Sequence, residues 1–208
     1  MKKFFIITGL VLLLTAGFVY AKSNKNAMPV IKFDKAKYTL AYSAKSDETG
    51  GYLNEYYKAN QTYASWNELI GVHHYPRAYY PIEHAEEFAE YLNSNDVMAN
   101  LETNEQENSA LLYFVVTDRS KLPIIMEFNV FKYEKSPVCG TVGLQYAKRY
   151  RLNSTLEIEK IKKEIVKSGL YYIKMLSKTS IPDIVTLDID KGKYVLREAQ
   201  NNDMENLD

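Results

Sequence analysis

Residues 111–150 read LLYFVVTDRSKLPIIMEFNVFKYEKSPVCGTVGLQYAKRY and contain three strand-like segments joined by short turns. The first, residues 111–116, is continuously apolar, as a strand buried on both faces would be. The second, residues 124–133, follows a turn. The third, residues 142–150, alternates between two sets of side chains, which predicts an amphipathic strand. Because short connections join antiparallel neighbours, the stretch predicts an antiparallel meander.

Four shorter segments toward the amino terminus also have the composition of strands. They are residues 30–33, 38–42, 52–58 and 69–75. Period-two alternation places Tyr38, Leu40 and Tyr42 on one face of their segment. Pro76 ends the last segment because proline has no N–H to donate to a ladder. The first three segments predict an antiparallel section that opens the domain.

Two segments have the periodicity of helices. In the first, Pro81 occupies a first-turn position, and an apolar face follows at helical spacing: Ile82, Ala85, Phe88, Ala89 and Leu92. The second begins near Ser154 and Glu157, which have capping-box spacing. Its apolar stripe consists of Ile158, Ile161, Ile165, Tyr172 and Leu176. Strands combined with two such helices predict an α+β fold class.

Three further features have weaker patterns. Residues 100–108 are acidic and rich in amides, which indicates a solvated loop or a short edge element. Residues 183–198 can form a small hairpin about the turn at 190–192. Trp66 precedes a strand, and a large aromatic residue in this position is expected to plug one end of the core, with stacking on a ligand as the alternative.

Residues 1–21 have the layout of a secretory signal peptide. Lys2 and Lys3 form a short basic region, residues 4–18 are apolar and uncharged, and cleavage is expected after Ala21. The competing interpretation is an uncleaved membrane anchor, because the apolar run is near the ~18-residue lower limit for spanning a bilayer. We therefore predict an exported protein that is periplasmic or secreted after cleavage, with a membrane-anchored form as the alternative.

The rest of the chain is predicted to hold one domain. Residues 22–28 form a polar linker, residues 29–198 a single α+β domain, and residues 199–208 a flexible tail. The chain has 26 basic and 26 acidic residues and no basic stripe, so nucleic acid is not expected as a partner. Its single cysteine, Cys139, excludes an intramolecular disulfide and is predicted to be a buried, inert thiol.

Three histidines close together suggest a metal site as one hypothesis. His73 and His74 are adjacent on a predicted strand, so their side chains point to opposite faces and cannot both bind one ion without a bulge. One of them, together with His84 and Glu87, forms the candidate ligand set. The simpler interpretation is that these histidines are structural or lie at the surface, and no cofactor is predicted.

Tyrosine is abundant, with 18 residues in the chain. Several lie in the loop between the last early strand and the first helix, and tyrosine is an efficient contact residue at protein interfaces. The candidate binding residues are therefore Tyr75, Arg77, Tyr79 and Tyr80. The alternative interpretation is that tyrosine is simply the aromatic residue that suits strands.

Catalytic motifs such as GxSxG, HExxH, a phosphate loop or a dinucleotide fingerprint are absent from the sequence. A cysteine-dependent hydrolase would need Cys139 to be reachable and a histidine beside it, which nothing in the sequence places there. We therefore predict a non-enzymatic protein that binds another envelope or secreted protein. It would reach the membrane only through an uncleaved signal segment. A metal-binding or metal-carrying periplasmic protein is the alternative.

Two packing motifs point to a known type of protein. Residues 66–72 read Trp-x-x-Leu-Ile-x-Val, and residues 143–146 read Gly-Leu-Gln-Tyr at the end of the meander. With the signal segment and the two helices, this order resembles small exported bacterial proteins of the PsbP-like and DcrB-like kind. The resemblance covers most of the chain after the signal. It implies a curved antiparallel β-sheet with two main helices packed against it, and it supplies no catalytic residues.

Overall fold

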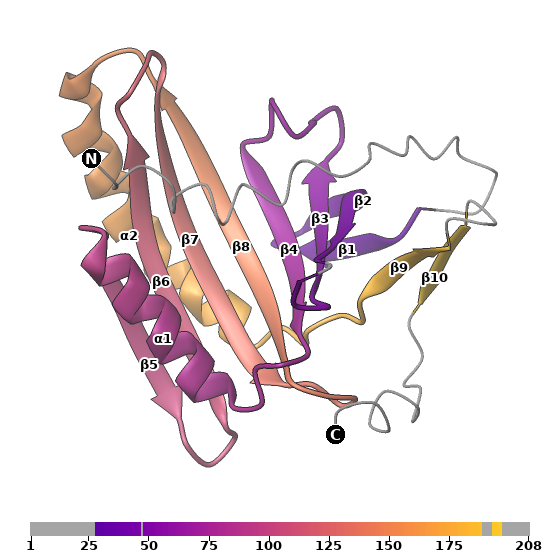
Figure 1. Cartoon of the computed structure of the whole chain (residues 1–208). Helices are drawn as coiled ribbons and strands as arrows, with labels where there is room; N and C mark the ends of the chain where they lie inside the picture. Colours follow the sequence, from indigo (N-terminus) through magenta and orange to yellow (C-terminus); the bar gives the residue numbers. More distant parts are fainter. Residues whose placement is uncertain (1–27, 47, 189–192, 197–208) are drawn as a thin grey trace.

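A computed structural model describes residues 28–46, 48–188 and 193–196 of the 208-residue chain (Figure 1). The predicted signal peptide, most of the predicted linker and the predicted tail lie outside this part of the chain (1–21, 22–27 and 199–208). The described residues form an eight-stranded antiparallel sheet with two helices packed on it, and a separate two-stranded sheet. The predicted α+β fold class is confirmed.

The strand order across the large sheet is β1-β2-β3-β4-β8-β7-β6-β5, and every pair of neighbours is antiparallel. The strands are β1 (Val30–Phe33), β2 (Ala36–Lys45), β3 (Tyr52–Lys58), β4 (Glu68–Tyr75), β5 (Ala99–Asn104), β6 (Ser109–Asp118), β7 (Ile124–Lys135) and β8 (Thr141–Leu152). The predicted meander is β6-β7-β8, and the predicted opening section is β1-β2-β3, to which the predicted strand β4 adds. Both predictions are confirmed.

The two sections join where β4 pairs with β8. The register runs from Glu68 opposite Lys148 to Tyr75 opposite Thr141. A helix and three strands separate β4 and β8 in the sequence, so this pairing is long-range. As a result, the end of β4, where the predicted contact loop begins, lies beside the start of β8.

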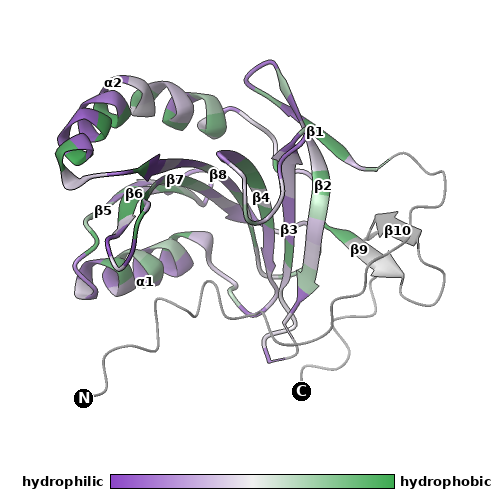
Figure 2. Ribbon diagram, turned by 90° about the horizontal axis from the view of Figure 1, so that it is seen from above, coloured by the Kyte–Doolittle hydropathy of each residue, from purple (hydrophilic) through white to green (hydrophobic). Residues whose placement is uncertain are grey.

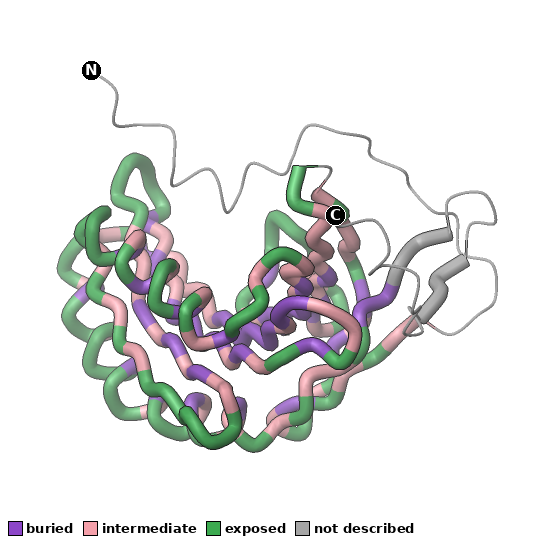
Figure 3. The backbone as a smooth tube through the Cα atoms, turned by 60° about the horizontal axis from the view of Figure 1, so that its bottom comes forward, coloured by how far each residue is buried: buried purple, intermediate pink, exposed green. Residues whose placement is uncertain are grey.

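The sheet is strongly bent. Figure 2 shows β5 to β8 as a layer between the two helices, whereas β2 and β3 turn away from that layer. The β2–β3 ladder shifts register between Leu40 and Tyr42, and an irregularity of this kind increases local twist. In Figure 3 the buried residues follow the strands through the centre, and the exposed residues lie on the helices and turns around them.

The two helices cover opposite faces of the sheet. They are α1 (Pro81–Ser94) and α2 (Ile158–Ser177). Alternate residues of β7 show the arrangement, because Phe128 and Val130 lie in the core with α2, whereas Phe131 and Tyr133 lie in the core with α1. Within the described residues, neither helix combines the length and the apolar composition that crossing a bilayer requires.

The second helix begins as its sequence suggests, with one difference. A short 3₁₀ turn, η2 (Thr155–Glu157), precedes α2, and the Glu157 carboxylate accepts hydrogen bonds from the Asn153 N–H (3.1 Å) and from the Ser154 hydroxyl (3.4 Å). The carboxylate therefore reaches back as a capping box requires, but to Asn153 and not to the Ser154 N–H. The predicted apolar stripe of α2 packs in the core or against it.

One strand prediction is wrong. We expected β8 to be amphipathic, but both of its faces are buried, with Leu144 and Tyr146 on the α2 side and Gln145 and Ala147 on the other. The reason is its central place between β4 and β7. Residues 100–108 hold an edge strand followed by a turn, which was the second of the two expectations for them.

After α2 the chain returns to the sheet at β3. Asn54, which is fully buried, donates through its side-chain amide to the Val185 carbonyl (2.9 Å) and accepts from the Val185 N–H (2.7 Å). Val185 begins β9 (Val185–Asp188), which pairs with β10 (Lys193–Leu196). The predicted hairpin is therefore confirmed in its pairing, and its turn at 190–192 lies outside the described residues.

Candidate functional site

The loop between β4 and α1 has a fixed backbone. The Ala78 N–H donates to the Tyr75 carbonyl (3.2 Å), and the Thr141 hydroxyl donates to the Ala78 carbonyl (2.6 Å). Gly140 packs directly on the loop, because a Cβ built on it would lie 2.1 Å from the Tyr75 carbonyl oxygen. Gly140 also has a φ of +68°, which favours glycine. The start of β8 therefore holds the loop in place.

The four predicted binding residues divide into two groups. Tyr79 and Tyr80 are 50% and 60% exposed, and Arg77 is also exposed. Tyr75 instead points inward, where its ring centroid lies 4.3 Å from that of His84. Three of the predicted residues thus form an exposed surface, whereas Tyr75 lies beneath it.

Tyr75 lines a pocket of about 270 Å³ between β4, β7 and α1. Its lining consists of Tyr75, His84, Glu87, Phe88 and Tyr133. The helical spacing of His84, Glu87 and Phe88 places all three along the side of α1 that borders the pocket. The His84 ring meets the Tyr133 ring edge-on, with centroids 5.4 Å apart, and the Tyr75 and Tyr133 centroids are 6.3 Å apart. The pocket is therefore mostly aromatic.

The Tyr133 ring of the pocket packs over a glycine. Gly143 lies between His73 and Tyr133 in the β4-β8-β7 register, and a Cβ on Gly143 would lie 3.2 Å from the Tyr133 ring. The absence of a side chain there lets Tyr133 lie across β8. The Tyr133 hydroxyl is buried and makes no hydrogen bond of standard geometry among the described residues, although the neighbouring Tyr75 side chain helps to raise its pKa.

Burial keeps the groups of the pocket uncharged. It lowers the pKa of His84, although the nearby Glu87 carboxylate partly opposes this effect. Burial also raises the pKa of Tyr75 and that of Tyr133. Glu87 is exposed and is the one carboxylate side chain of the lining. The pocket is thus a neutral aromatic surface with a carboxylate at its edge.

His73 lies behind the pocket and begins a chain of side-chain hydrogen bonds. Its ring stacks on Tyr75 with centroids 5.8 Å apart and an interplanar angle of 6°. His73 Nε2 lies 3.0 Å from Gln145 Oε1, and the Gln145 amide donates to Asn129 Oδ1 (2.9 Å). Because an amide oxygen only accepts, Nε2 carries the proton. Burial lowers the pKa of His73 to about 4, so the ring is neutral at pH 7.

His74 occupies the opposite face of the sheet. Its Nε2 lies 2.9 Å from the Cys139 carbonyl oxygen and 3.9 Å from the Cys139 Sγ. The structure therefore brings a histidine beside Cys139, which the sequence did not reveal, and Cys139 is half-buried, not buried as expected. A nitrogen that donates to a carbonyl does not accept the thiol proton, so in this geometry His74 Nε2 is engaged by the Cys139 backbone.

The candidate metal ligands come together only in part. His73, His84 and Glu87 lie on the α1 side of the sheet, but His74 faces away from them. Among the residues that the structure describes, no group of three or more histidine, cysteine or acidic side chains is placed to hold a metal ion. His73 and His84 instead contact aromatic rings.

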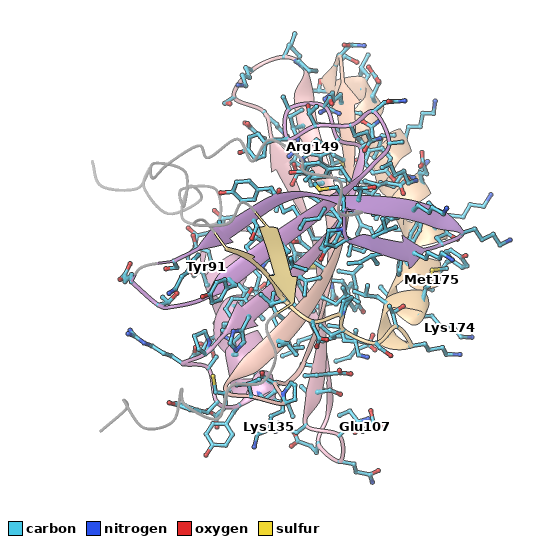
Figure 4. All side chains as sticks on the ribbon, turned by 90° about the vertical axis from the view of Figure 1, so that its right-hand side faces the viewer. Tyr91, Glu107, Lys135, Arg149, Lys174 and Met175 are labelled. Carbon is cyan, nitrogen blue, oxygen red and sulfur yellow. The ribbon has the colours of Figure 1, made fainter. Side chains whose placement is uncertain are left out.

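A polar cluster lies on the face of the sheet that α1 covers, near the carboxyl end of β8. The Arg149 guanidinium lies 3.6 Å from the centroid of the Trp66 ring, and its Nε donates to Glu127 Oε1 (2.6 Å). The neighbouring Glu55 accepts from the Tyr57 hydroxyl, and burial raises the pKa of Glu55. Figure 4 shows Arg149 near one end of the molecule and Lys135 near the other.

Trp66 has the structural role that the sequence predicts. It is 4% exposed and packs in a small cluster of buried side chains with Tyr57, Leu69 and Ala147. Arg151 fixes the backbone around it by donating to the Trp66 carbonyl (3.1 Å) and to the Ala64 carbonyl (3.0 Å). The arginines thus hold the β3–β4 loop against β8. These contacts could not be predicted from the sequence, because they join residues far apart in the chain.

Comparison with known proteins identifies a family for the chain. A protein-family model matches residues 26–181, which include β1 to α2 and every residue of the pocket. The chain belongs to that family. No curated protein and no solved structure matches the chain. None of these comparisons connects the chain with PsbP-like or DcrB-like proteins, so that resemblance stays a prediction.

Proposed function

We propose that this member of the family is an exported, non-enzymatic binding protein of the cell envelope. Its partner is another envelope or secreted protein. The contact surface consists of the β4–α1 loop, with Arg77, Tyr79 and Tyr80, and the adjoining pocket at Tyr75 and His84. The proposal rests on one observation above all, which is that two exposed tyrosines stand on a fixed backbone beside an aromatic pocket.

The composition of the surface supports binding to a protein. Tyrosine and arginine are enriched where proteins meet, and the residues that contribute most to affinity are often of these types. Tyr79 and Tyr80 each present at least half of their surface to solvent. An exposed aromatic pair of this kind offers a large contact area.

The fixed backbone supports the same proposal. Thr141 and Gly140 hold the loop from the β8 side, and Pro81 at the first turn of α1 is buried. A loop that is already ordered loses little conformational entropy when a partner binds. The binding free energy contributed by the exposed tyrosines would therefore not be offset by the entropic cost of ordering the loop.

The export of the protein is inferred from residues 1–21. A short basic region, an apolar run and a cleavage point after Ala21 are the parts of a secretory signal. After cleavage the domain would be periplasmic or secreted. Uncleaved, the same segment would anchor it to the membrane.

Binding, not catalysis, matches the chemistry of the pocket. Its lining holds no serine, threonine or cysteine to act as a nucleophile. His84 packs against the rings of Tyr75 and Tyr133, and these contacts orient its ring. We therefore assign these side chains to recognition.

The test is capture of partners from the native envelope fraction by the immobilised protein. Wild type is compared with the double variant Tyr79→Ala/Tyr80→Ala and with the control Tyr63→Ala. Tyr63 is 50% exposed, like Tyr79, but lies in the β3–β4 loop at the other end of β4. We expect a partner that wild type and Tyr63→Ala retain and the double variant loses. Equal retention by all three proteins would reject the loop as the contact surface.

A further inference from the structure

We infer that the pocket of Tyr75, His84, Glu87, Phe88 and Tyr133 takes a cationic side chain, a lysine or an arginine, of the protein partner. This inference rests on the proposed function and specifies its chemistry. Size is the first argument. A volume of about 270 Å³ lies below the roughly 300–1,000 Å³ of pockets that enclose small molecules. One long side chain suits it better than a whole ligand.

The aromatic walls of the pocket also favour a cationic occupant. Tyr75, Phe88 and Tyr133 belong to three different elements and line one space, with His84 between the two tyrosines. Aromatic rings attract ammonium and guanidinium groups through their negative faces, and several rings together form a cage for such groups. The tilt of 52° between Tyr75 and Tyr133 and of 88° between His84 and Tyr133 sets these walls at angles to one another.

Polar groups at the two ends of the pocket can also bind a cation. At its edge, the Glu87 carboxylate is the charged group of the lining and can pair with a cation. Inside, the Tyr133 hydroxyl is buried and makes no hydrogen bond of standard geometry among the described residues, and it interacts with the Tyr75 side chain. A hydroxyl oxygen has two lone pairs, so that of Tyr133 can accept a hydrogen bond from the N–H of a guanidinium or ammonium group.

The surroundings have charges of both signs. On α1 the exposed acids Glu83, Glu86 and Glu90 accompany Glu87, and α1 contains no lysine or arginine. Arg77 and Lys135 are exposed near the end of β4 but do not line the pocket. Glu87 is therefore the charged residue that an occupant of the pocket contacts. Because its charge is negative, it favours a cationic occupant.

To test this inference, the purified protein is titrated with three small amino-acid derivatives, and the backbone amide resonances of the protein are followed by NMR. The probes are N-acetyl-arginine amide, N-acetyl-lysine amide and the neutral N-acetyl-norleucine amide. We expect saturable shifts around His84 and Phe88 with at least one cationic probe and none with norleucine. Norleucine binding as tightly as both cations would overturn the inference, because the pocket would then be merely apolar.

Variants test the role of the carboxylate. Glu87→Gln should weaken binding of the cationic probe about fivefold, the scale of one partly exposed charge pair. The control Glu159→Gln removes the same charge from the start of α2, on the opposite face of the sheet, and should leave affinity within about twofold. Equal affinities for wild type and Glu87→Gln would also overturn the inference.

Capture from the envelope separates this inference from the function on which it rests. If Glu87→Gln captures less of the partner than wild type does, both stand. If Glu87→Gln captures as much of a partner as wild type while Tyr79→Ala/Tyr80→Ala loses it, the binding function stands and the cationic occupant is rejected. If the double variant also retains the partner, the proposed contact surface itself is rejected.

Discussion

His73 and Gln145 meet directly above Gly71. His73 Nε2 lies 3.0 Å from Gln145 Oε1, and a Cβ built on Gly71 would lie 2.9 Å from the first atom and 2.7 Å from the second. Gly71 pairs with Gln145 across the β4–β8 ladder. The hydrogen bond between the two side chains therefore exists because the strand beneath it has no side chain of its own.

The first prediction concerns this glycine. Gly71→Ala should force His73 and Gln145 apart and destabilise the fold by about 1–3 kcal/mol, the usual cost of overpacking a buried site. Urea unfolding of wild type and variant measures the difference. The double variant Gly71→Ala/Gln145→Ala should recover part of it, because truncation of Gln145 removes the closest contact. Wild-type stability for Gly71→Ala alone would contradict the proposed packing.

The second prediction is a pH dependence of stability due to His73. Burial lowers its pKa to about 4, against an ordinary value of 6.5. Between these values the unfolded chain binds more protons than the folded chain, so stability falls as pH falls from 6.5 to 4 and levels off below. The free energy of unfolding therefore decreases by at most about 3 kcal/mol between pH 7 and pH 4 because of His73.

Comparison with His73→Gln isolates this effect. Burial lowers the pKa of His84, which acts in the same direction, and raises that of Glu55, which acts in the opposite direction. Both remain in the variant. We expect urea unfolding at pH 7 and at pH 4.5 to show a smaller loss for His73→Gln than for wild type. Identical losses would mean that His73 is not buried in its neutral form.

The strands could be predicted from the sequence because their signals are local. The apolar run at 111–116 and the alternation at 142–150 describe single strands, and short turns connect them. The β4–β8 pairing has no such signal, because it joins residues that a helix and three strands separate. The same long-range contact places Gln145 beside His73. The burial of both faces of β8 could not be foreseen for the same reason.

The candidate site was predicted in part. The density of tyrosine marked the loop that contains Tyr79 and Tyr80, and helical spacing indicated that His84 and Glu87 lie together. Tyr133 was not predicted, because it reaches the pocket from β7 only after the sheet forms. The rings that surround His84 give that histidine an aromatic environment. Sequence spacing alone could not distinguish such an environment from a metal site.

The third prediction concerns Asn54, whose side chain makes two hydrogen bonds to the backbone of Val185. Asn54→Ala should leave the Val185 N–H and carbonyl without these partners and destabilise the fold by about 2 kcal/mol. Amide hydrogen exchange should become faster at Val185 before it does so in β7. The control Asn100→Ala changes an exposed residue of the edge strand β5 and should have little effect. Unchanged exchange at Val185 would show that other contacts hold this segment.

The fourth prediction concerns Arg149, whose guanidinium carbon lies 3.6 Å from the centroid of the Trp66 ring while its Nε donates to Glu127. A lysine cannot stack a planar group on the ring and donate to the carboxylate at the same time. Arg149→Lys should therefore destabilise the protein by about 1–2 kcal/mol.

The single tryptophan of the chain gives a direct measurement of this change. Trp66 is 4% exposed, and loss of the stacked guanidinium should admit water and shift its emission to longer wavelength. The control Arg77→Lys, in the exposed β4–α1 loop, should leave the emission unchanged. If Arg149→Lys kept the wild-type emission and the wild-type unfolding midpoint, packing of Trp66 against Tyr57, Leu69 and Ala147 alone would be enough to hold the β3–β4 loop.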